Sequence, residues 1–139
     1  MFMGTDYNSI DERNRMIIPA KHREEIGEQC VLTKGFDPCL YIYTMEEWER
    51  LVEKLKELKG SKKQVRNIIR HFSANAERCD VDKKGRILLT PELKKYAGIT
   101  KDLAIVGAVD KIEIWAKDAY EKQAEADDLD EDAWEEIDF

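Results

Sequence analysis

The sequence has 139 residues, of which 42% are hydrophobic and 38% are charged, so it has the length of one ordinary domain and enough apolar material for a core. No apolar run approaches the roughly 20 residues of a membrane-spanning helix, and the first residues lack the basic and long apolar stretches of a signal peptide. These properties argue against a membrane protein, and we expect a cytosolic one. The three cysteines form no Cys-x-x-Cys pair, which argues against a disulfide framework and a zinc site.

The net charge of -7 is distributed unevenly along the chain. Residues 121–139 hold ten acids and one base, Lys122, and therefore carry -9. Residues 1–120 are left with 22 bases and 20 acids, a net charge of +2. The acidic total therefore does not exclude a body with basic patches that bind nucleic acid.

The first part of the chain predicts short strands and one short helix. Tyr7–Ile10 is a turn-bounded segment, and Met16–Ile18 is an apolar run that suits a buried strand. Pro19–Ile26 predicts a helix with proline at its first position, where a missing amide donor costs little. Cys30–Thr33 and Leu40–Tyr43 predict two strands joined by a hairpin-like connection.

Two longer helices are predicted in the middle of the chain, each beginning with a capping box. Thr44 and Glu47 form the first box, and Ser61 and Gln64 form the second. Each helix also has apolar residues along one face, and an apolar stripe of this kind indicates core or a subunit interface more often than a ligand site. The residues at helical spacing on one face are Trp48, Leu51, Val52, Leu55 and Leu58 in the first helix, and Val65, Ile68, Ile69 and Phe72 in the second.

The second part predicts the same succession of elements. Ile87–Leu89 is the next apolar run, and Pro91–Ala97 is a second helix that begins with proline. Leu103–Val109 and Ile112–Trp115 predict two further strands, and Asp118–Ala126 predicts a helix with a weak apolar face.

Two charged segments each leave two interpretations open. A basic run without any acid either lines a phosphate path or is a solvated helix face; it comprises Lys59, Lys62, Lys63, Arg66 and Arg70. In the acidic segment, Trp134, Ile137 and Phe139 are either disordered or dock on a partner subunit, and disorder is the simpler expectation.

The most informative pattern is a duplication. Asp11–Ala20 returns as Asp82–Pro91 at an offset of about 71 residues, with the acid, the arginine and the apolar triplet in register. Gly35–Tyr43 matches Gly107–Trp115 at an offset of 72, one residue longer because of a small insertion between the blocks. One small unit therefore occurs twice, and each copy alone is too short to bury much apolar surface.

The duplication predicts the domain organisation. We expect one domain over residues 1–120, made of two repeats at about 5–58 and 76–120 that share a core and are joined by a helix at about 61–75. Residues 121–139 then form an acidic tail.

The repeated Asp-x-x-x-Arg motif is the candidate binding site. It places a carboxylate and a guanidinium at the two ends of a tight loop, and Asn14 and Gly85 tolerate the positive φ that such a turn requires. Short acidic side chains commonly accept hydrogen bonds from loop amides, whereas guanidinium groups suit guanine edges and phosphates. The predicted DNA-binding residues are Arg13, Arg15, Lys83, Lys84 and Arg86, and the predicted loop-shaping residues are Asp11, Asn14, Asp82 and Gly85.

No enzymatic motif is evident. His22 and His71 are the only histidines, and neither has informative spacing to a nucleophile or to metal ligands, so we interpret them as surface or helix-packing residues. No carboxylates are paired for acid–base catalysis, and there is no glycine-rich phosphate loop. We expect a non-enzyme that needs no metal and no cofactor.

The doubled Asp-x-x-x-Arg blocks, the opening Met1–Gly4, the segment Arg86–Leu93 and the stretch Gly107–Trp115 together resemble the MraZ family of bacterial transcriptional regulators, from the first residue to about Tyr120. The resemblance implies an α+β fold, a pseudo-two-fold, double-split β-α-β arrangement forming an AbrB/MraZ-like barrel with additional helices. It also implies a homo-oligomeric ring that binds short direct repeats in double-stranded promoter DNA and represses its own division and cell-wall operon.

The chain departs from the family pattern at three positions. Asn14 stands where the family commonly has glycine in Asp-x-x-Gly-Arg, and Glu12 adds a negative charge near the DNA, which puts base contacts by the first copy in doubt. His22 stands where an apolar aromatic residue is more usual, so we expect the first copy's core to be slightly looser.

Our leading hypothesis is a cytosolic, nucleoid-associated, sequence-specific DNA-binding repressor. Arg15 and Arg86 would contact base edges or nearby phosphates, and Arg13, Lys83 and Lys84 would contact the backbone. The alternative is a non-enzymatic, ring-forming scaffold whose basic loops bind an acidic partner surface, including the chain's own tail. A further hypothesis is that this tail competes with DNA for the loops.

Overall fold

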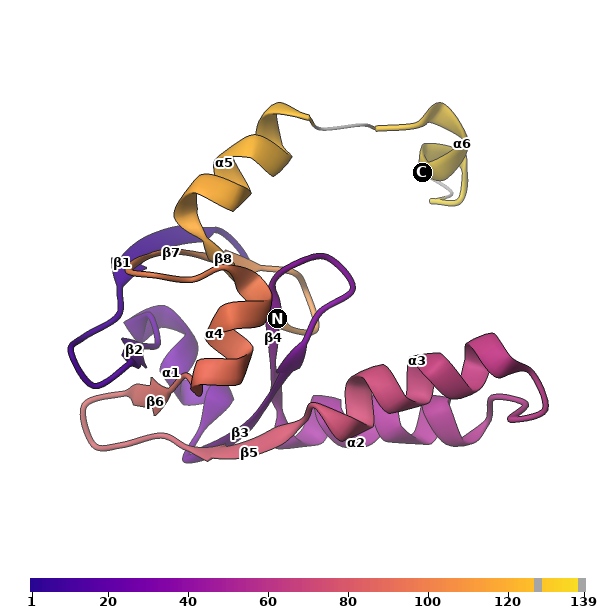
Figure 1. The fold of residues 1–139 in the computed structure, drawn as a ribbon, viewed down its shortest axis with the longest axis horizontal. Helices are drawn as coiled ribbons and strands as arrows, with labels where there is room; N and C mark the ends of the chain where they lie inside the picture. The colour runs from indigo at the N-terminus through magenta and orange to yellow at the C-terminus, as the bar shows by residue number, and fades with distance from the viewer. Residues whose placement is uncertain (127–128, 138–139) are drawn as a thin grey trace.

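The computed structural model describes residues 1–126 and 129–137 (Figure 1). The elements of the first part are β1 Thr5–Ser9, β2 Arg15–Ile17, α1 Ala20–Ile26, β3 Gln29–Lys34, β4 Leu40–Thr44, α2 Met45–Lys56 and α3 Lys63–Ala74. Those of the second part are β5 Glu77–Asp80, β6 Arg86–Leu88, α4 Pro91–Ala97, β7 Asp102–Gly107, β8 Ile112–Ala116, α5 Lys117–Glu125 and α6 Glu131–Glu135.

The strands of the two halves interleave in antiparallel sheets. One six-stranded sheet has the order β1-β7-β8-β4-β3-β5, so β1 of the first half pairs with β7 of the second and β4 pairs with β8. A separate two-stranded sheet pairs β2 with β6, with Met16 opposite Ile87. The expected α+β class is confirmed. Among the described residues, β1 and β5 are edge strands that do not pair with each other, so the six-stranded sheet is not closed.

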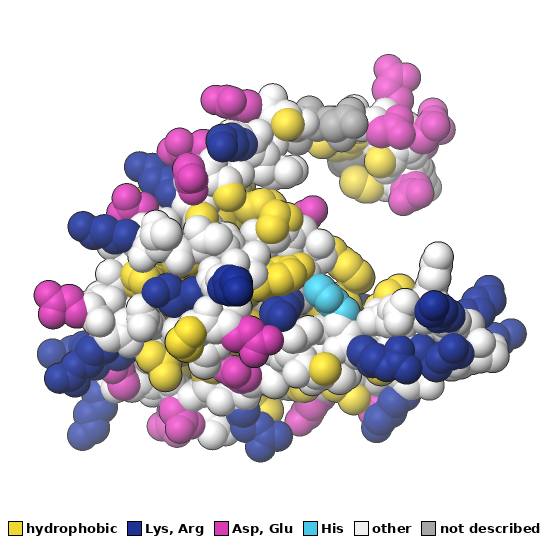
Figure 2. Space-filling view, in the orientation of Figure 1, with side chains coloured by type: hydrophobic (Ala, Val, Ile, Leu, Met, Phe, Trp, Pro, Cys, Tyr) yellow, Lys and Arg dark blue, Asp and Glu magenta, His cyan; other side chains and the backbone are white. Residues whose placement is uncertain are grey.

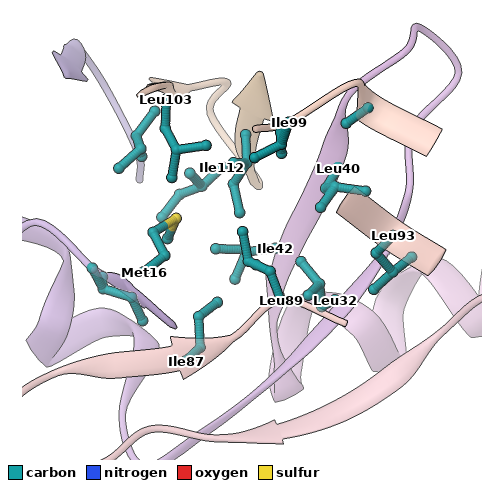
Figure 3. Packing of buried hydrophobic residues seen from close by; sticks show 14 of the residues in the cluster. Met16, Leu32, Leu40, Ile42, Ile87, Leu89, Leu93, Ile99, Leu103 and Ile112 are labelled. Atoms are coloured by element: carbon teal, nitrogen blue, oxygen red, sulfur yellow. The ribbon is translucent and has the colours of Figure 1, made fainter. Parts of the chain in front are cut away.

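A single apolar core lies between the two sheets and draws on both halves (Figure 3). Met16 and Ile87 are fully buried on the short β2–β6 ladder, whereas Ile17 and Leu88 next to them are exposed. This alternation is the period of two that a strand with one buried face shows. Each such buried side chain stabilises the fold by about 1.5 to 3 kcal/mol relative to an exposed one. The β2–β6 ladder is therefore anchored on the core.

Helices α2 and α3 run alongside each other and extend from one end of the sheet as an arm (Figure 1). Leu55 of α2 and Phe72 of α3 join a second apolar cluster with Tyr41, Tyr43 and Trp115. Every residue of β4 is buried, because one sheet face meets the main core and the other meets this cluster. The predicted apolar faces of the two helices thus contribute to the core, through Leu55 near the outer end of α2 and Phe72 near the inner end of α3.

One predicted capping box is confirmed at its N-cap, while its Glu47 side chain binds Arg50, and the other box is wrong. Thr44 accepts a hydrogen bond from the amide of Glu47 at 3.0 Å at the start of α2. Helix α3 instead begins at Lys63, and Lys62 at its N-cap makes no side-chain capping bond. Arg66 donates from Nη1 to the carbonyls of Gly60 and Ser61, so the arginine side chain holds the loop that the Ser61 hydroxyl was expected to cap.

Two further expectations need correction. Pro19 is the N-cap of α1 and not its first helical residue, because its ψ of 137° is extended; Pro91 does begin α4 as predicted. Strand β7 ends at Gly107, before Val109, whose φ of +69° is incompatible with a strand. Trp134 lies in the short helix α6, which Asp130 caps, and Ile137 follows that helix. Phe139 lies outside the described residues.

In the described part of the chain, no helix has the length and apolar character needed to cross a membrane.

Candidate nucleic-acid interface

The first Asp-x-x-x-Arg motif forms a closed turn that leads into β2. The Oδ1 atom of Asp11 accepts hydrogen bonds from the amides of Arg13 and Arg15, both at 2.9 Å. The Oδ2 atom of Asp11 accepts from Nε of Arg15 at 2.8 Å. Backbone bonds from Asn14 to Asp11 and from Asp11 to Arg15, both 3.0 Å, complete the turn. One carboxylate therefore holds both the backbone and the arginine side chain.

The second motif repeats this geometry before β6. The Oδ1 atom of Asp82 accepts from the amides of Lys84 and Arg86 at 2.9 and 2.8 Å, and Oδ2 accepts from Nε of Arg86 at 2.7 Å. The amide of Gly85 donates to the carbonyl of Asp82 at 2.9 Å. The two motifs thus build the same turn twice.

The electrostatics of the turns follow from these bonds. The backbone amide of Arg15 is the largest cause of a lowered pKa for Asp11, and the amide of Arg86 has the same effect on the pKa of Asp82. Donors that bind the charged form of a carboxyl stabilise it. Both aspartates are therefore ionised at neutral pH, and they hold their turns with charge-assisted hydrogen bonds.

Each aspartate occupies only one nitrogen of its arginine. The side chains of Arg15 and Arg86 are 27% and 22% exposed, and within the described residues their Nη atoms have no hydrogen-bond partner. A guanidinium carries five N–H donors in a rigid fork. The Nε bond fixes the direction of the fork and leaves its four terminal donors available to a ligand.

Further cations surround the two turns. Arg13, Lys83 and Lys84 are exposed and form no ion pair within residues 1–126 and 129–137. Figure 2 shows dark blue side chains gathered at the end of the molecule where Figure 1 places these turns. The tips of the turns therefore present positive charge, with Glu28 and Asp80 in the hollow beside Lys83 as neighbouring acids.

The β2–β6 ladder brings the two turns together. Ile17 lies opposite Arg86, and Arg15 lies opposite Leu88, so the two arginine backbones are two residues apart along a three-residue ladder. That spacing is roughly 7 Å along the strand direction. The structure thus places all the predicted DNA-binding and loop-shaping residues in two turns that flank one short ladder. The basic run on α3 is not part of this site, because α3 points to the other end of the molecule (Figure 1).

Each turn is supported by the opposite half of the chain. The amide of Ile18 donates to the carbonyl of Gly85, and the amide of Leu89 donates to the carbonyl of Asn14, both at 2.8 Å. The two bonds are related by the repeat offset of 71 residues. They tie the first turn to the second half and the second turn to the first half.

Two side chains continue this crossed support, and the sequence analysis did not identify them. Lys94 of α4 donates to Oδ1 of Asn14 at 2.7 Å. Arg23 of α1 donates to the carbonyl of Ile18 at 2.9 Å and covers Gly85, where an added Cβ would lie 2.4 Å from its Nε. Arg23 and Lys94 are themselves 71 residues apart, so the repeat offset was the signal that could have revealed them.

His22 on α1 is a packing residue and not a surface residue. It is only 4% exposed, it contacts the Phe2 ring edge-on at 5.2 Å, and its Nε2 has no hydrogen-bond partner among the residues that the structure describes. Burial is the main cause of its lowered pKa, and the Lys21 charge adds to the effect. The described residues contain no group of three or more His, Cys, Asp or Glu side chains placed to bind a metal.

Fold and site together define a class of protein: two fused repeats with interleaved strands that present paired, arginine-bearing turns from one basic end. A family model described as "MraZ protein, putative antitoxin-like" matches residues 1–71 and again 72–138. The chain is 46% identical to the transcriptional regulator MraZ of Caldanaerobacter subterraneus subsp. tengcongensis over 93% of its length and 90% of that protein. It is 47% identical to the transcriptional regulator MraZ of Clostridium tetani over 91% of its length and 89% of that protein. The chain belongs to the MraZ family of transcriptional regulators.

Proposed function

We propose that this chain is a sequence-specific DNA-binding repressor whose contacts with DNA are made by the two Asp-x-x-x-Arg turns. The observation that carries the proposal is the guanidinium geometry of Arg15 and Arg86. Each is held by its aspartate through Nε, and its Nη atoms are available to a ligand. A fixed fork of this kind can form paired hydrogen bonds with O6 and N7 of guanine or with phosphate oxygens. The arginines are therefore the groups that carry sequence specificity.

The neighbouring cations have a different role in this proposal. Arg13, Lys83 and Lys84 are exposed at the turn tips and have no rigid partner, so they suit phosphate contacts that position the protein without reading sequence. Such contacts make affinity fall steeply with salt concentration. The negative charge of the whole chain does not oppose this binding, because residues 121–139 alone account for -9.

A single chain offers only two closely spaced turns, which is a small surface for specific binding. We propose that several copies, arranged as a ring, engage successive direct repeats in promoter DNA, so that weak individual contacts add up through effective concentration. The regulated promoter in this proposal is that of the chain's own division and cell-wall operon, at the nucleoid.

The test is a DNA-binding titration of the full chain at physiological salt, using duplex from upstream of its own gene and a scrambled duplex. We expect the Arg15→Ala/Arg86→Ala variant to lose its preference for the upstream duplex while its oligomeric mass is unchanged. The matched control is Arg50→Ala/Arg78→Ala, which removes two exposed arginines that lie outside the turns. It should keep the preference.

Two other outcomes would contradict the proposal. Equal loss in the control and the turn variant would show a general charge effect. Absent or equal binding of both duplexes by the unmodified protein would favour a ring-forming scaffold whose turns bind an acidic protein surface.

A further inference from the structure

The fold brings two of the three cysteines together. Cys30 lies in β3 and Cys79 lies in β5, and the antiparallel register of these neighbouring strands places the two residues directly opposite each other (Figure 1). Residues paired in this way point to the same face of a sheet, and both side chains pack on the main apolar core. The Cys30 thiol donates a hydrogen bond to Sγ of Cys79. Topology thus creates a cysteine pair that the spacing of cysteines in the sequence does not show.

The distance between the paired strands suits a disulfide. Directly opposite residues on antiparallel strands have Cα atoms roughly 4.5 to 5.5 Å apart, and a disulfide accepts Cα separations of about 4.4 to 6.8 Å. The Cβ atoms of such a pair lie roughly 4.5 to 5.5 Å apart, whereas a disulfide draws them to about 3.8 Å. Closing the bond between Cys30 and Cys79 therefore requires the strands to approach by about 1 Å.

Strand β5 can make this small movement. It has four residues, and within the described chain it is an edge strand that pairs with β3 alone. Strand β3, by contrast, lies between β4 and β5 and is held on both sides. Segments with few buried contacts open and shift at a lower free-energy cost than core strands do. The edge position of β5 therefore allows the two sulfur atoms to reach bonding distance while the rest of the sheet stays in place.

The two thiols differ in access and in acidity. Cys30 is fully buried, whereas Cys79 is partly exposed at the sheet edge. The hydrogen bond from Cys30 lowers the pKa of Cys79, and the same bond together with burial raises the pKa of Cys30. Because the thiolate is the nucleophilic form of cysteine, Cys79 reacts first with a small oxidant from solvent, and Cys30 is placed to complete the disulfide.

We propose that Cys30 and Cys79 form a peroxide-reactive site that closes to a disulfide between β3 and β5 within one chain. The oxidant belongs to the class of small hydroperoxides, which can reach a partly exposed sulfur at a sheet edge. The proposal does not depend on DNA binding, and the test below contains no DNA, so it succeeds or fails independently of the proposed repressor function.

The reaction balances in two steps. The Cys79 thiolate attacks one oxygen of hydrogen peroxide, so that an S–O bond forms, the O–O bond breaks, and the leaving oxygen takes up a proton to become water. Sγ of Cys30 then attacks Sγ of the Cys79 sulfenic acid, so that the S–S bond forms and the S–O bond breaks. The departing hydroxide leaves as water with the Cys30 proton. The two thiols are oxidised by two electrons, and the peroxide is reduced by them.

Cys39 is an internal control for this chemistry. It is fully buried in the second apolar cluster, whereas Cys30 and Cys79 belong to the main core. Burial is the largest cause of a raised pKa for the Cys39 thiol. A buried thiol in apolar surroundings is inert toward oxidants, so we expect Cys39 to stay reduced under conditions that oxidise the pair.

The experiment treats the reduced full chain with a small molar excess of hydrogen peroxide under native conditions. The remaining thiols are alkylated, and the digested protein is analysed by mass spectrometry without reduction. We expect a peptide that links Cys30 to Cys79, alkylated Cys39, and loss of the link after treatment with dithiothreitol. Non-reducing gel electrophoresis should show a single-chain band, because the bond forms within one chain.

Two variants separate the roles of the cysteines. Cys30→Ala removes the thiol that completes the disulfide, so oxidation should stop at a sulfenic acid on Cys79, and dimedone should label Cys79 at least about tenfold more than Cys39. The matched control is Cys39→Ala, which also removes one buried thiol and should form the Cys30–Cys79 link in unchanged yield. Circular dichroism verifies that both variants are folded.

Three results would overturn the proposal. A disulfide that joins two chains would show that the paired thiols do not react with each other. Oxidation of Cys39 at the same rate as Cys79 would show that the pair has no special reactivity. Complete alkylation of Cys30 and Cys79 after peroxide treatment of the unmodified protein would show that the site does not react.

Discussion

The two Asp-x-x-x-Arg turns have nearly the same geometry, but they solve one local problem in opposite ways. Asn14 and Gly85 occupy the same place in the turn with φ of +60° and +78°. In the first turn the Asn14 side chain is used, because it binds Lys94. In the second turn, Gly85 has no side chain, and Arg23 fills the space that a Cβ atom would occupy. The comparison shows that one backbone shape was kept while its support changed.

This difference bears on the departure from the family pattern at Asn14. Asparagine tolerates positive φ better than most residues. Here its side-chain oxygen also accepts a hydrogen bond from the ammonium group of the partly buried Lys94. The hydrogen-bond lengths around Asp11 match those around Asp82 to within 0.1 Å. Asn14 therefore does not distort the first turn, and the following predictions test whether the two turns are equivalent.

The largest expected effect concerns DNA binding by single arginine variants. Arg15→Ala and Arg86→Ala should each weaken binding to the preferred duplex by about 1 to 3 kcal/mol per engaged site if both arginines contact bases. Titrations of each variant against preferred and scrambled duplex measure this. If Arg15→Ala weakens both duplexes equally and Arg86→Ala only the preferred one, the first turn is a phosphate contact and the turns are not equivalent.

A smaller effect is expected on folding stability from Gly85→Ala. The added Cβ meets the Arg23 guanidinium and a backbone with φ of +78°, so the free energy of unfolding should fall by about 2 kcal/mol. Asn14→Ala, the matched change in the first turn, should cost about 1 kcal/mol. Urea unfolding of both variants gives the comparison, and equal costs would contradict the idea that the turns differ in their support.

His22 gives a second contrast between the repeats, because Leu93 is its counterpart 71 residues later and is equally buried. His22→Leu should raise stability by about 1 kcal/mol, since it removes a buried nitrogen that has no partner.

The gain from His22→Leu should also depend on pH. The folded-state pKa of His22 lies below its ordinary value of 6.5, so the unfolded chain takes up a proton before the folded chain does. Stability in the unmodified protein is therefore full above pH 6.5 and falls as the pH drops below it. Thermal unfolding at pH 7.5 and 5.5 should show the larger gain at 5.5; a gain independent of pH would mean that neighbouring Asp6 and Glu25 compensate the charge.

The smallest effect is expected from Lys94→Met, which keeps the side chain's length and removes its bond to Asn14. The loss should be roughly 0.5 kcal/mol, because the contact is a single hydrogen bond near the surface. A double-mutant cycle with Asn14→Gly isolates the energy of the interaction between Lys94 and Asn14. A coupling energy near zero would show that Lys94 does not support the first turn.

The turns were predictable from the sequence because their bonds are local. Asp11 reaches only as far as Arg15, and Asp82 only as far as Arg86, so spacing alone places the partners. The N-cap bond predicted at Thr44 is present for the same reason. The box at Ser61 failed although its spacing is correct, because the N-cap of α3 is Lys62, one residue later, and Arg66 binds the carbonyls of Gly60 and Ser61 in the loop before it.

The crossed support of the turns was not predictable in this way. Lys94 and Asn14 are 80 residues apart, and nothing in the composition near either residue requires the other. The pairing of Ile18 with Gly85 likewise depends on the interleaving of β2 with β6. Local patterns thus identified what each turn contains, whereas the identity of its neighbours depended on topology.

The interleaved sheet also has a consequence for how the protein is made. Strand β1 is synthesised well before its partner β7, which begins at Asp102, and Thr5 pairs with Val106. At a synthesis rate of about 5 to 20 residues per second, β1 waits on the order of 5 to 20 s for that partner. By the end of this time β3 has both its partners, β4 and β5, and β2 has β6, whereas β1 still has none. Completion of the fold is therefore a late event of translation, and ribosome pausing before β7 prolongs the exposure of the unpaired first strand.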